Sequence, residues 1–199
     1  MEPQEIKVLY KGKIRKGVIK QYSIYSGGFG VELKDGHMVH PNDVELISEE
    51  NNSLIDTIKH KIRIKQLIEL FVQKLEHCSL IHDNSKLSEE EKPYFDNATK
   101  LRDLTYGSPE YKEALKNLKP ALDHHYKNNS HHPEHFLNGI NNMDLFDVVE
   151  MFFDWKAASE RHGDGDIYKS IQYNHKRYQM SNQLTSIFEN TAKNFNWTK

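Results

Sequence analysis

The stretch SLIDTIKHKIRIKQLIELFVQKL, residues 53–75, decides the fold class that we predict for this chain of 199 residues. Its apolar side chains recur three or four positions apart, which is the period of one face of an α-helix. They are Leu54, Ile55, Ile58, Ile62, Leu67, Ile68, Phe71 and Leu75. The sequence before this stretch is strand-like, and the sequence after it reads as helix and loop. We therefore predict a mainly α protein with a small β module at its start.

The β module is predicted over residues 1–48, where short alternating runs are separated by turn sequences. These runs are residues 6–10, 17–22, 29–33 and 38–40. Four or five short strands in so few residues are typical of a small SH3-like β-barrel. The polar stretch 49–52 is a hinge, and residues 53–199 form a second, all-helical domain. Further helices are predicted after Ser88, over 109–118, from Met143 to 163–166, and over 167–190.

Charge and cysteine content narrow the classes of function. The formal net charge of −2 requires neither a nucleic acid nor an anionic membrane as partner. The first half of the β module is nevertheless basic, which is typical either of a solvated strand face or of a docking surface for nucleic acid or an acidic partner. Its basic residues are Lys7, Lys11, Lys13, Arg15, Lys16 and Lys20.

The single cysteine, Cys78, excludes an internal disulfide and any metal site built from several thiolates. A cysteine content this low is typical of proteins in a reducing compartment. No run approaches the roughly 18 apolar residues of a membrane span. The polar stretch 1–5 shows no secretory signal. We expect a cytoplasmic protein with no membrane partner.

Histidine is the residue type that points to function, because eight of the twelve histidines lie between His60 and His135. Five of them fall within residues 124–135, where Asn128, Asn129 and Pro133 disfavour a helix. A hydrophobic core cannot satisfy so many imidazoles. The stretch is therefore either a loop that folds histidines inward or a solvated histidine-rich loop.

Two further segments of the sequence contain candidate metal ligands. His82 and Asp83 are adjacent after an apolar run, and an imidazole beside a carboxylate suits borderline divalent metals. His60 shares a helix face with apolar residues, so we expect it to point inward, either as a core histidine or as a ligand. Lys86 adds a cation where a phosphate could sit.

The fourth group of candidate ligands is a row of carboxylates, Asp147, Glu150 and Asp154, along one side of the predicted helix from Met143. Each has a structural alternative to ligation. Asp147 can pair with Asp144 in a helix cap and complement the helix dipole. Asp154 can be a solvated charge.

The order of His60, then His82-Asp83, then Asp147 resembles the HD-domain superfamily of metal-dependent phosphohydrolases, over about residues 53–190. His82-Asp83-x-x-Lys86 is similar to the form found in its cyclic-dinucleotide phosphodiesterases and its di-iron oxygenases. His131-His132-Pro133-Glu134, followed by Gly139, resembles an element of the phosphodiesterase branch. Residues 125–155 also look like an uncharacterised HD-like family of bacterial and phage genomes. The fold that this resemblance implies is an HD-like helical bundle.

The resemblance implies one or two divalent transition-metal ions: Mn, Fe, Co, Ni or Zn. One would be held by His60, His82, Asp83 and Asp147, and a second by His125, His131 and His132. This sequence departs from the cyclic-dinucleotide enzymes at 139–141, where Gly-Ile-Asn stands in place of Gly-Tyr-Pro. His60 and His82 are also 22 residues apart, about 33 Å along an unbroken helix. They can share a metal only if the chain turns back between them.

The function that we expect is metal-dependent hydrolysis of a nucleotide or another phosphate ester by a metal-activated water. We expect Asp83 and Lys86 to be catalytic residues, and Lys86 also to bind a phosphate oxygen of the substrate. Glu134 or Glu150 would be the general acid. The rest of a nucleotide would be clamped by Arg161, Lys169, Asn174 and Arg177. A di-iron oxygenase on the same scaffold and a non-catalytic nucleotide or nucleic-acid binding module are the alternatives.

Overall fold

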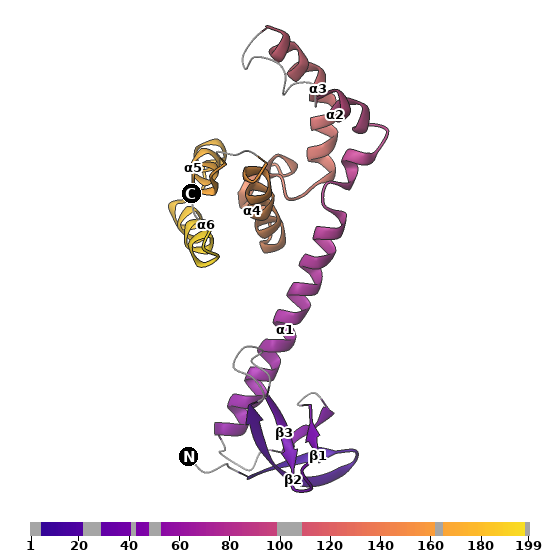
Figure 1. Cartoon of the computed structure of the whole chain (residues 1–199), viewed down its shortest axis with the longest axis vertical. Coiled ribbons are helices and arrows are strands. Elements are labelled where there is room, and N and C mark those ends of the chain that lie inside the picture. The colour runs from indigo at the N-terminus through magenta and orange to yellow at the C-terminus, as the bar shows by residue number, and fades with distance from the viewer. Residues whose placement is uncertain are drawn as a thin grey trace. The chain divides into compact units, whose positions relative to one another are not determined.

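The computed structural model describes residues 5–21, 29–40, 43–47, 53–98, 109–161 and 165–197. The chain divides into two compact units, residues 1–72 and 73–199. The first unit holds a small sheet and the start of a long helix, and the second holds the shorter helices (Figure 1). The prediction of a mainly α protein with a β module at its start is confirmed.

The first unit contains an antiparallel sheet of five strands in the order β4-β3-β2-β1-β5. The strands are β1 (Glu5–Tyr10), β2 (Lys13–Gln21), β3 (Phe29–Leu33), β4 (Met38–Val39) and β5 (Glu45–Ile47). Lys11 and Gly12 both have positive φ, 48° and 71°, which makes the tight turn that the β1–β2 hairpin requires. Within the described ranges the outer strands β4 and β5 do not pair, so the expected SH3-like barrel is not closed.

The basic face of this sheet is partly neutralised. Arg15 lies 3.2 Å from Asp35, and Lys16 lies 3.2 Å from Glu5. The ammonium of Lys11 lies 5.2 Å from the centre of the Tyr10 ring. Pairs at such exposed positions contribute little to stability.

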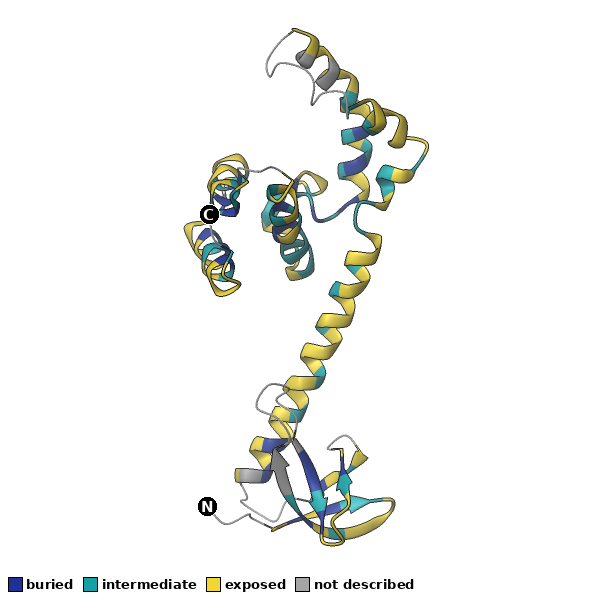
Figure 2. Cartoon of the chain, viewed as in Figure 1, coloured by how far each residue is buried: buried dark blue, intermediate teal, exposed yellow. Residues whose placement is uncertain are grey.

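Helix α1 (Ser53–Ile81) begins where the sequence predicts and runs without a break for 29 residues. Its first turns complete the core of the first unit, because Ile55 and Ile58 pack with six sheet residues. Those six are Ile6, Val8, Val31, Leu33, Val39 and Leu46. Further along the helix, Leu67 and Ile68 were expected on its buried face but are exposed, as Figure 2 shows for the middle of α1.

The second unit is built from short helical segments. They are η2 (Asn84–Leu87), α2 (Lys92–Ala98), α3 (Pro109–Asn128), η4 (Pro133–His135), η5 (Gly139–Asn142), α4 (Leu145–Ser159), α5 (Ile167–Tyr178) and α6 (Asn182–Asn194). Helix α3 continues ten residues past the predicted end at 118, so His124 and His125 stand on a helix and not in a loop. Its final turns form despite Pro120.

The prediction of one helix over 167–190 is wrong, because the chain forms α5 and α6 there. Gln179 adopts a left-handed conformation (φ 51°) that ends α5. The hydroxyl of Ser181 then accepts a hydrogen bond from the Leu184 amide and caps α6. Helical periodicity runs through both segments and hides this break.

The core of the second unit lies among α4, α5 and α6. Its buried residues are Met151, Phe152, Trp155, Ile167, Ile171, Met180, Phe188 and Ala192. The rings of Phe152 and Phe188 stack with centroids 4.7 Å apart. This packing fixes the rotation of α4 and therefore decides which of its carboxylates turn away from the core. No helix in the described part of the chain is long and apolar enough to cross a membrane.

Candidate metal centre

The centre starts at the end of α1, where the backbone changes direction. Asp83 has φ 57° and ψ 13°, a left-handed conformation that aspartate tolerates better than most residues. Helix α1 ends at Ile81, His82 follows it, and Asp83 is the N-cap residue of the short helix η2. A non-glycine residue held in this region often belongs to a functional site. This turn presents the side chains of His82 and Asp83 to the rest of the unit.

The end of α3 and the residues that follow it supply three imidazoles. His125 and His131 are buried, and His132 is half-buried. The side-chain amide of Asn129 donates to the backbone oxygen of His125 (2.7 Å) and to the hydroxyl of Ser85 (2.7 Å). These bonds tie the end of α3 to η2. Residues 44 positions apart in sequence therefore face one another.

Four side chains each contribute one potential ligand atom to a single cluster: Asp83, His125, His131 and His132. The Asp83 Oδ1 atom lies 3.2 Å from His125 Nε2 and 3.5 Å from His131 Nε2. His125 Nε2 and His132 Nε2 are 2.9 Å apart. All four atoms lie within 4.8 Å of one another.

The chemistry of these donors fits a metal ion. Asp83 Oδ1 and His131 Nε2 are buried and have no hydrogen-bond partner in the part of the chain that the structure describes. Such orphaned atoms are costly without a partner. Imidazole nitrogen and carboxylate oxygen bind zinc-like ions at about 2.0–2.2 Å, so two ligand atoms of one ion lie about 2.8–3.6 Å apart for coordination angles between octahedral and tetrahedral. The observed separations of 2.9, 3.2 and 3.5 Å match this spacing.

A second group shares His131 and consists of His82, His131 and Glu150. Glu150 Oε1 lies 2.8 Å from His82 Nδ1 and 3.2 Å from His131 Nδ1. Asp154, one helical turn further along α4, lies 3.7 Å from His82 Nε2. The two nitrogens of His131 thus face different carboxylates. Glu150 can orient His131 for the first group or help to hold a second ion.

The carboxylates of the centre are held in their charged form. Burial opposes the charge on Asp83, but the neighbouring His125, His131 and Lys86 outweigh it and hold the pKa of Asp83 well below its usual range. Burial also opposes the charge on Glu150, and His131 and His82 lower its pKa to about 2. The ammonium of Lys86 donates directly to Asp83 Oδ2, a contact that the sequence analysis did not predict. The centre can therefore offer anionic ligands at neutral pH.

The surroundings shift the pKa values of two of the imidazoles in opposite directions. Burial and the neighbouring His131 and His125 lower the pKa of His132 to about 3. Hydrogen bonds to Asp154 and Glu150 raise the pKa of His82 to about 10. A neutral imidazole is the form that binds a metal, so His132 is ready to act as a ligand. The raised pKa favours the cationic form of His82 in the metal-free protein, so His82 would have to lose a proton to serve as a ligand.

The prediction that Asp147 is a metal ligand is not supported by its position. Its Oδ2 accepts from the Asp144 amide and its Oδ1 from the Ser130 hydroxyl, at 3.0 and 2.6 Å. Asp144 reciprocates by accepting from the Asp147 amide, which completes a capping box at the start of α4. The structural alternative that we considered for Asp147 describes it better. Glu150 and Asp154 on the same helix face the histidines instead.

His60 is also outside the centre. It is exposed on α1, where we expected it to point inward, and it belongs to the first unit. The chain reversal that would bring it to His82 does not occur, because α1 is unbroken up to Ile81. Both candidate ligand groups form without it.

The predicted acid Glu134 and the predicted substrate residue Arg177 contact each other, and neither belongs to the candidate ligand groups. Arg177 Nη2 donates to Glu134 Oε1 at 2.7 Å, and the Tyr178 hydroxyl donates to the same oxygen at 3.1 Å. Both line a cavity of about 380 Å³ whose wall begins at Pro133, one residue after His132. Burial opposes the charge on Arg177, but Tyr178 and Glu134 raise its pKa.

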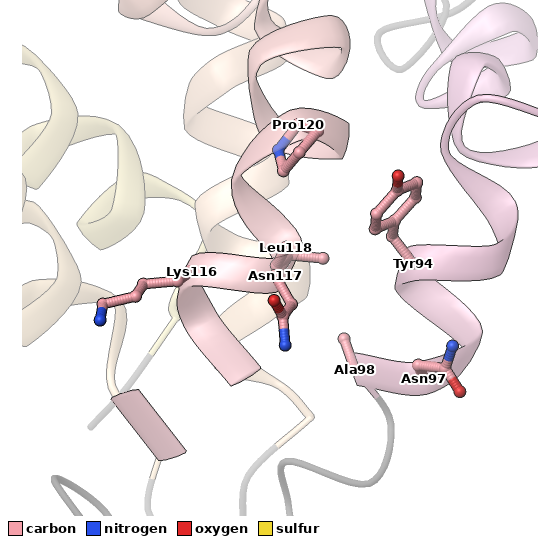
Figure 3. Close-up of a pocket in the computed structure, with 7 residues that line it drawn as sticks. All are labelled: Tyr94, Asn97, Ala98, Lys116, Asn117, Leu118 and Pro120. Atoms are coloured by element: carbon pink, nitrogen blue, oxygen red, sulfur yellow. The ribbon is translucent and has the colours of Figure 1, made fainter. Parts of the chain in front are cut away.

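Of the other three predicted substrate residues, Arg161 follows α4, and Lys169 and Asn174 lie on α5. Arg161 and Lys169 are exposed, and Asn174 is buried within 3.5 Å of the Ser170 hydroxyl. A separate cavity of about 530 Å³ lies between α2 and α3 (Figure 3). Its lining consists of Tyr94, Asn97, Ala98, Lys116, Asn117, Leu118 and Pro120. It contains none of the predicted site residues.

Glu91 is the site residue that the sequence analysis missed. Its side chain is fully buried and contacts both His124 and His125. The sequence offers only a weak signal, because Glu91 is the third of three consecutive glutamates. Only the packing of α2 against α3 distinguishes it from Glu89 and Glu90, which are exposed.

The fold and the site define a mostly helical protein with a candidate histidine–carboxylate metal centre. The chain belongs to DUF5662, a family of unknown function, which it matches over residues 49–194. The match begins at the predicted hinge and leaves the strands outside it. No curated protein and no solved structure matches the chain.

Proposed function

We propose that this protein is a metal-dependent phosphohydrolase that acts on a nucleotide or another phosphate ester. The observation that carries the proposal is the pair of buried atoms Asp83 Oδ1 and His131 Nε2, which lie 3.5 Å apart without a hydrogen-bond partner in the described residues. The resemblance of His82-Asp83-x-x-Lys86 to HD-domain enzymes supports the assignment of the reaction.

Asp83, His125, His131 and His132 would hold the first ion, and His82 with Glu150 supports a second. Nitrogen and oxygen donors without thiolates favour Mn, Fe, Co, Ni or Zn. Such an ion supplies hydroxide from water near neutral pH and polarises a phosphoryl oxygen.

Residues of the chain itself would bind and orient the substrate. Lys86 keeps its ammonium at Asp83 and is about one-third exposed, so one face of the cation can reach a phosphate oxygen. The cavity at Glu134 and Arg177 supports a role in binding a polar part of the substrate. In that arrangement Glu134 positions Arg177 and is not the general acid.

The experiment is metal analysis combined with a phosphate-release panel. Protein purified without a nickel column is expected to contain one or two equivalents of a transition metal and to release phosphate from at least one nucleotide or phosphate ester. His131→Ala is expected to lose both the metal and the activity. His77→Ala, which alters an exposed histidine of α1, is the matched control and keeps both.

Two outcomes would contradict the proposal. Protein that contains no metal and binds none on addition has no metal centre. Protein that binds iron specifically, consumes oxygen and releases no phosphate is an oxygenase on this scaffold.

A further inference from the structure

The Glu91 carboxylate is fully buried, with an exposed fraction of 0%. Removing a carboxylate from water is costly unless it is paired and hydrogen-bonded. Its Oε1 lies 2.7 Å from His124 Nδ1 and its Oε2 lies 3.0 Å from His125 Nδ1. Two adjacent histidines of α3 thus share the acidic side chain of the residue that precedes α2.

The contact with His125 has a consequence for the other side of its ring. A carboxylate only accepts hydrogen bonds, so the Nδ1 atom that faces it carries the proton. In the neutral imidazole, which is the form that binds a metal, the proton-free nitrogen is then Nε2, which lies 3.2 Å from Asp83 Oδ1 and 2.9 Å from His132 Nε2.

The same arrangement recurs at the neighbouring ligand. His131 turns Nε2 toward Asp83 and Nδ1 toward Glu150, 3.2 Å away. Two imidazoles therefore approach one aspartate oxygen with a carboxylate behind each of them. Partners of this kind fix the tautomer and the orientation of metal-bound histidines in other proteins.

We infer that Glu91 is a positioning residue for the metal centre, which holds His125 with its Nε2 atom free and directed at the ion. The inference rests on the proposed metal site and adds a residue outside both groups of candidate ligands. The Ser85 hydroxyl lies 3.0 Å from His125 Nδ1, and the Asn129 amide, 3.1 Å from that nitrogen, donates to the His125 carbonyl oxygen and to the Ser85 hydroxyl.

The test uses the full chain and Co²⁺ as the probe, because the visible spectrum of Co²⁺ reports its ligands. We expect Glu91→Gln to weaken Co²⁺ binding by about 10- to 100-fold in competition with a chelator and to shift the visible bands. Glu91→Asp keeps the charge and is expected to recover part of the affinity. Glu89→Gln alters an exposed glutamate of the same run and is expected to bind like the wild type.

A purely structural role would appear as a lower unfolding midpoint in chelator without a change in affinity or spectrum, and this result would overturn the inference. Should Glu91→Gln fail to fold, the comparison passes to Glu91→Asp. Affinity and bands of Glu91→Asp equal to those of the wild type would overturn the inference, and weakened binding with shifted bands would support it. Wild-type protein that binds no Co²⁺, Mn²⁺, Zn²⁺ or Fe²⁺ would overturn the proposed function as well. Wild-type binding with an unaffected Glu91→Gln variant would overturn this inference alone.

Discussion

Metal binding is expected to raise the thermal stability of the helical unit by an amount that can be calculated. An ion present at 100 times its Kd, and bound only by the folded state, contributes about 2.7 kcal/mol. Unfolding gains about 2.1 cal/mol/K per residue, which over residues 73–199 sums to about 270 cal/mol/K. The ratio predicts a rise of about 10 °C in the unfolding midpoint.

Asp83→Asn is the variant that assigns this rise to the centre. It removes the charged oxygen that faces both His125 and His131 while keeping the size of the side chain. We expect the midpoint of this variant to change by less than about 3 °C on metal addition, since most of the binding free energy is lost. The control is Asp123→Asn, an exposed carboxylate of α3 that pairs with Lys119.

Calorimetry or far-ultraviolet circular dichroism, in chelator and then in excess Mn²⁺ or Zn²⁺, measures both midpoints. Coincident wild-type curves in chelator and in metal would refute the reasoning. A rise in Asp83→Asn as large as that of the wild type would place the ion elsewhere.

Two further predictions concern histidines. His60→Ala is expected to leave the metal affinity, measured by competition with a chelator, within about twofold of wild type. The reason is that His60 is exposed and outside both candidate ligand groups. A tenfold loss of affinity would show that His60 is a ligand. In metal-free protein, the hydrogen bonds to Asp154 and Glu150 raise the pKa of His82 from 6.5 to about 10. This stabilisation is fully present below pH 6.5 and is lost as the pH rises through 10, so the midpoint in chelator should fall over that range and Asp154→Asn should flatten the fall. A midpoint that rises with pH in the wild type would contradict the assignment.

Local sequence was sufficient where a feature depends on neighbours along the chain. The periodicity of residues 53–75 predicted the start and the type of α1. The turn at Lys11-Gly12 and the capping pair of Asp144 and Asp147 could be identified in the same way. Each of these depends on contacts within about four residues.

Sequence reasoning failed where the choice among neighbouring candidates depends on packing between segments that are distant in the sequence. Asp147, Glu150 and Asp154 were equivalent candidates on one helix. The choice among them depends on the rotation of α4, which is fixed by Phe152 and Trp155 packing in the core. Glu91 could not be separated from its two neighbours without knowing that α2 packs against α3.

By itself, the sequence determined the chemistry that this protein can offer: imidazoles and carboxylates in place of thiolates, on a mainly helical chain after a short run of strands. The tertiary structure alone decided which of those groups meet. Ligation needs atoms about 3 Å apart, and that distance is set by helix packing between segments 40 to 70 positions apart, which no local pattern encodes.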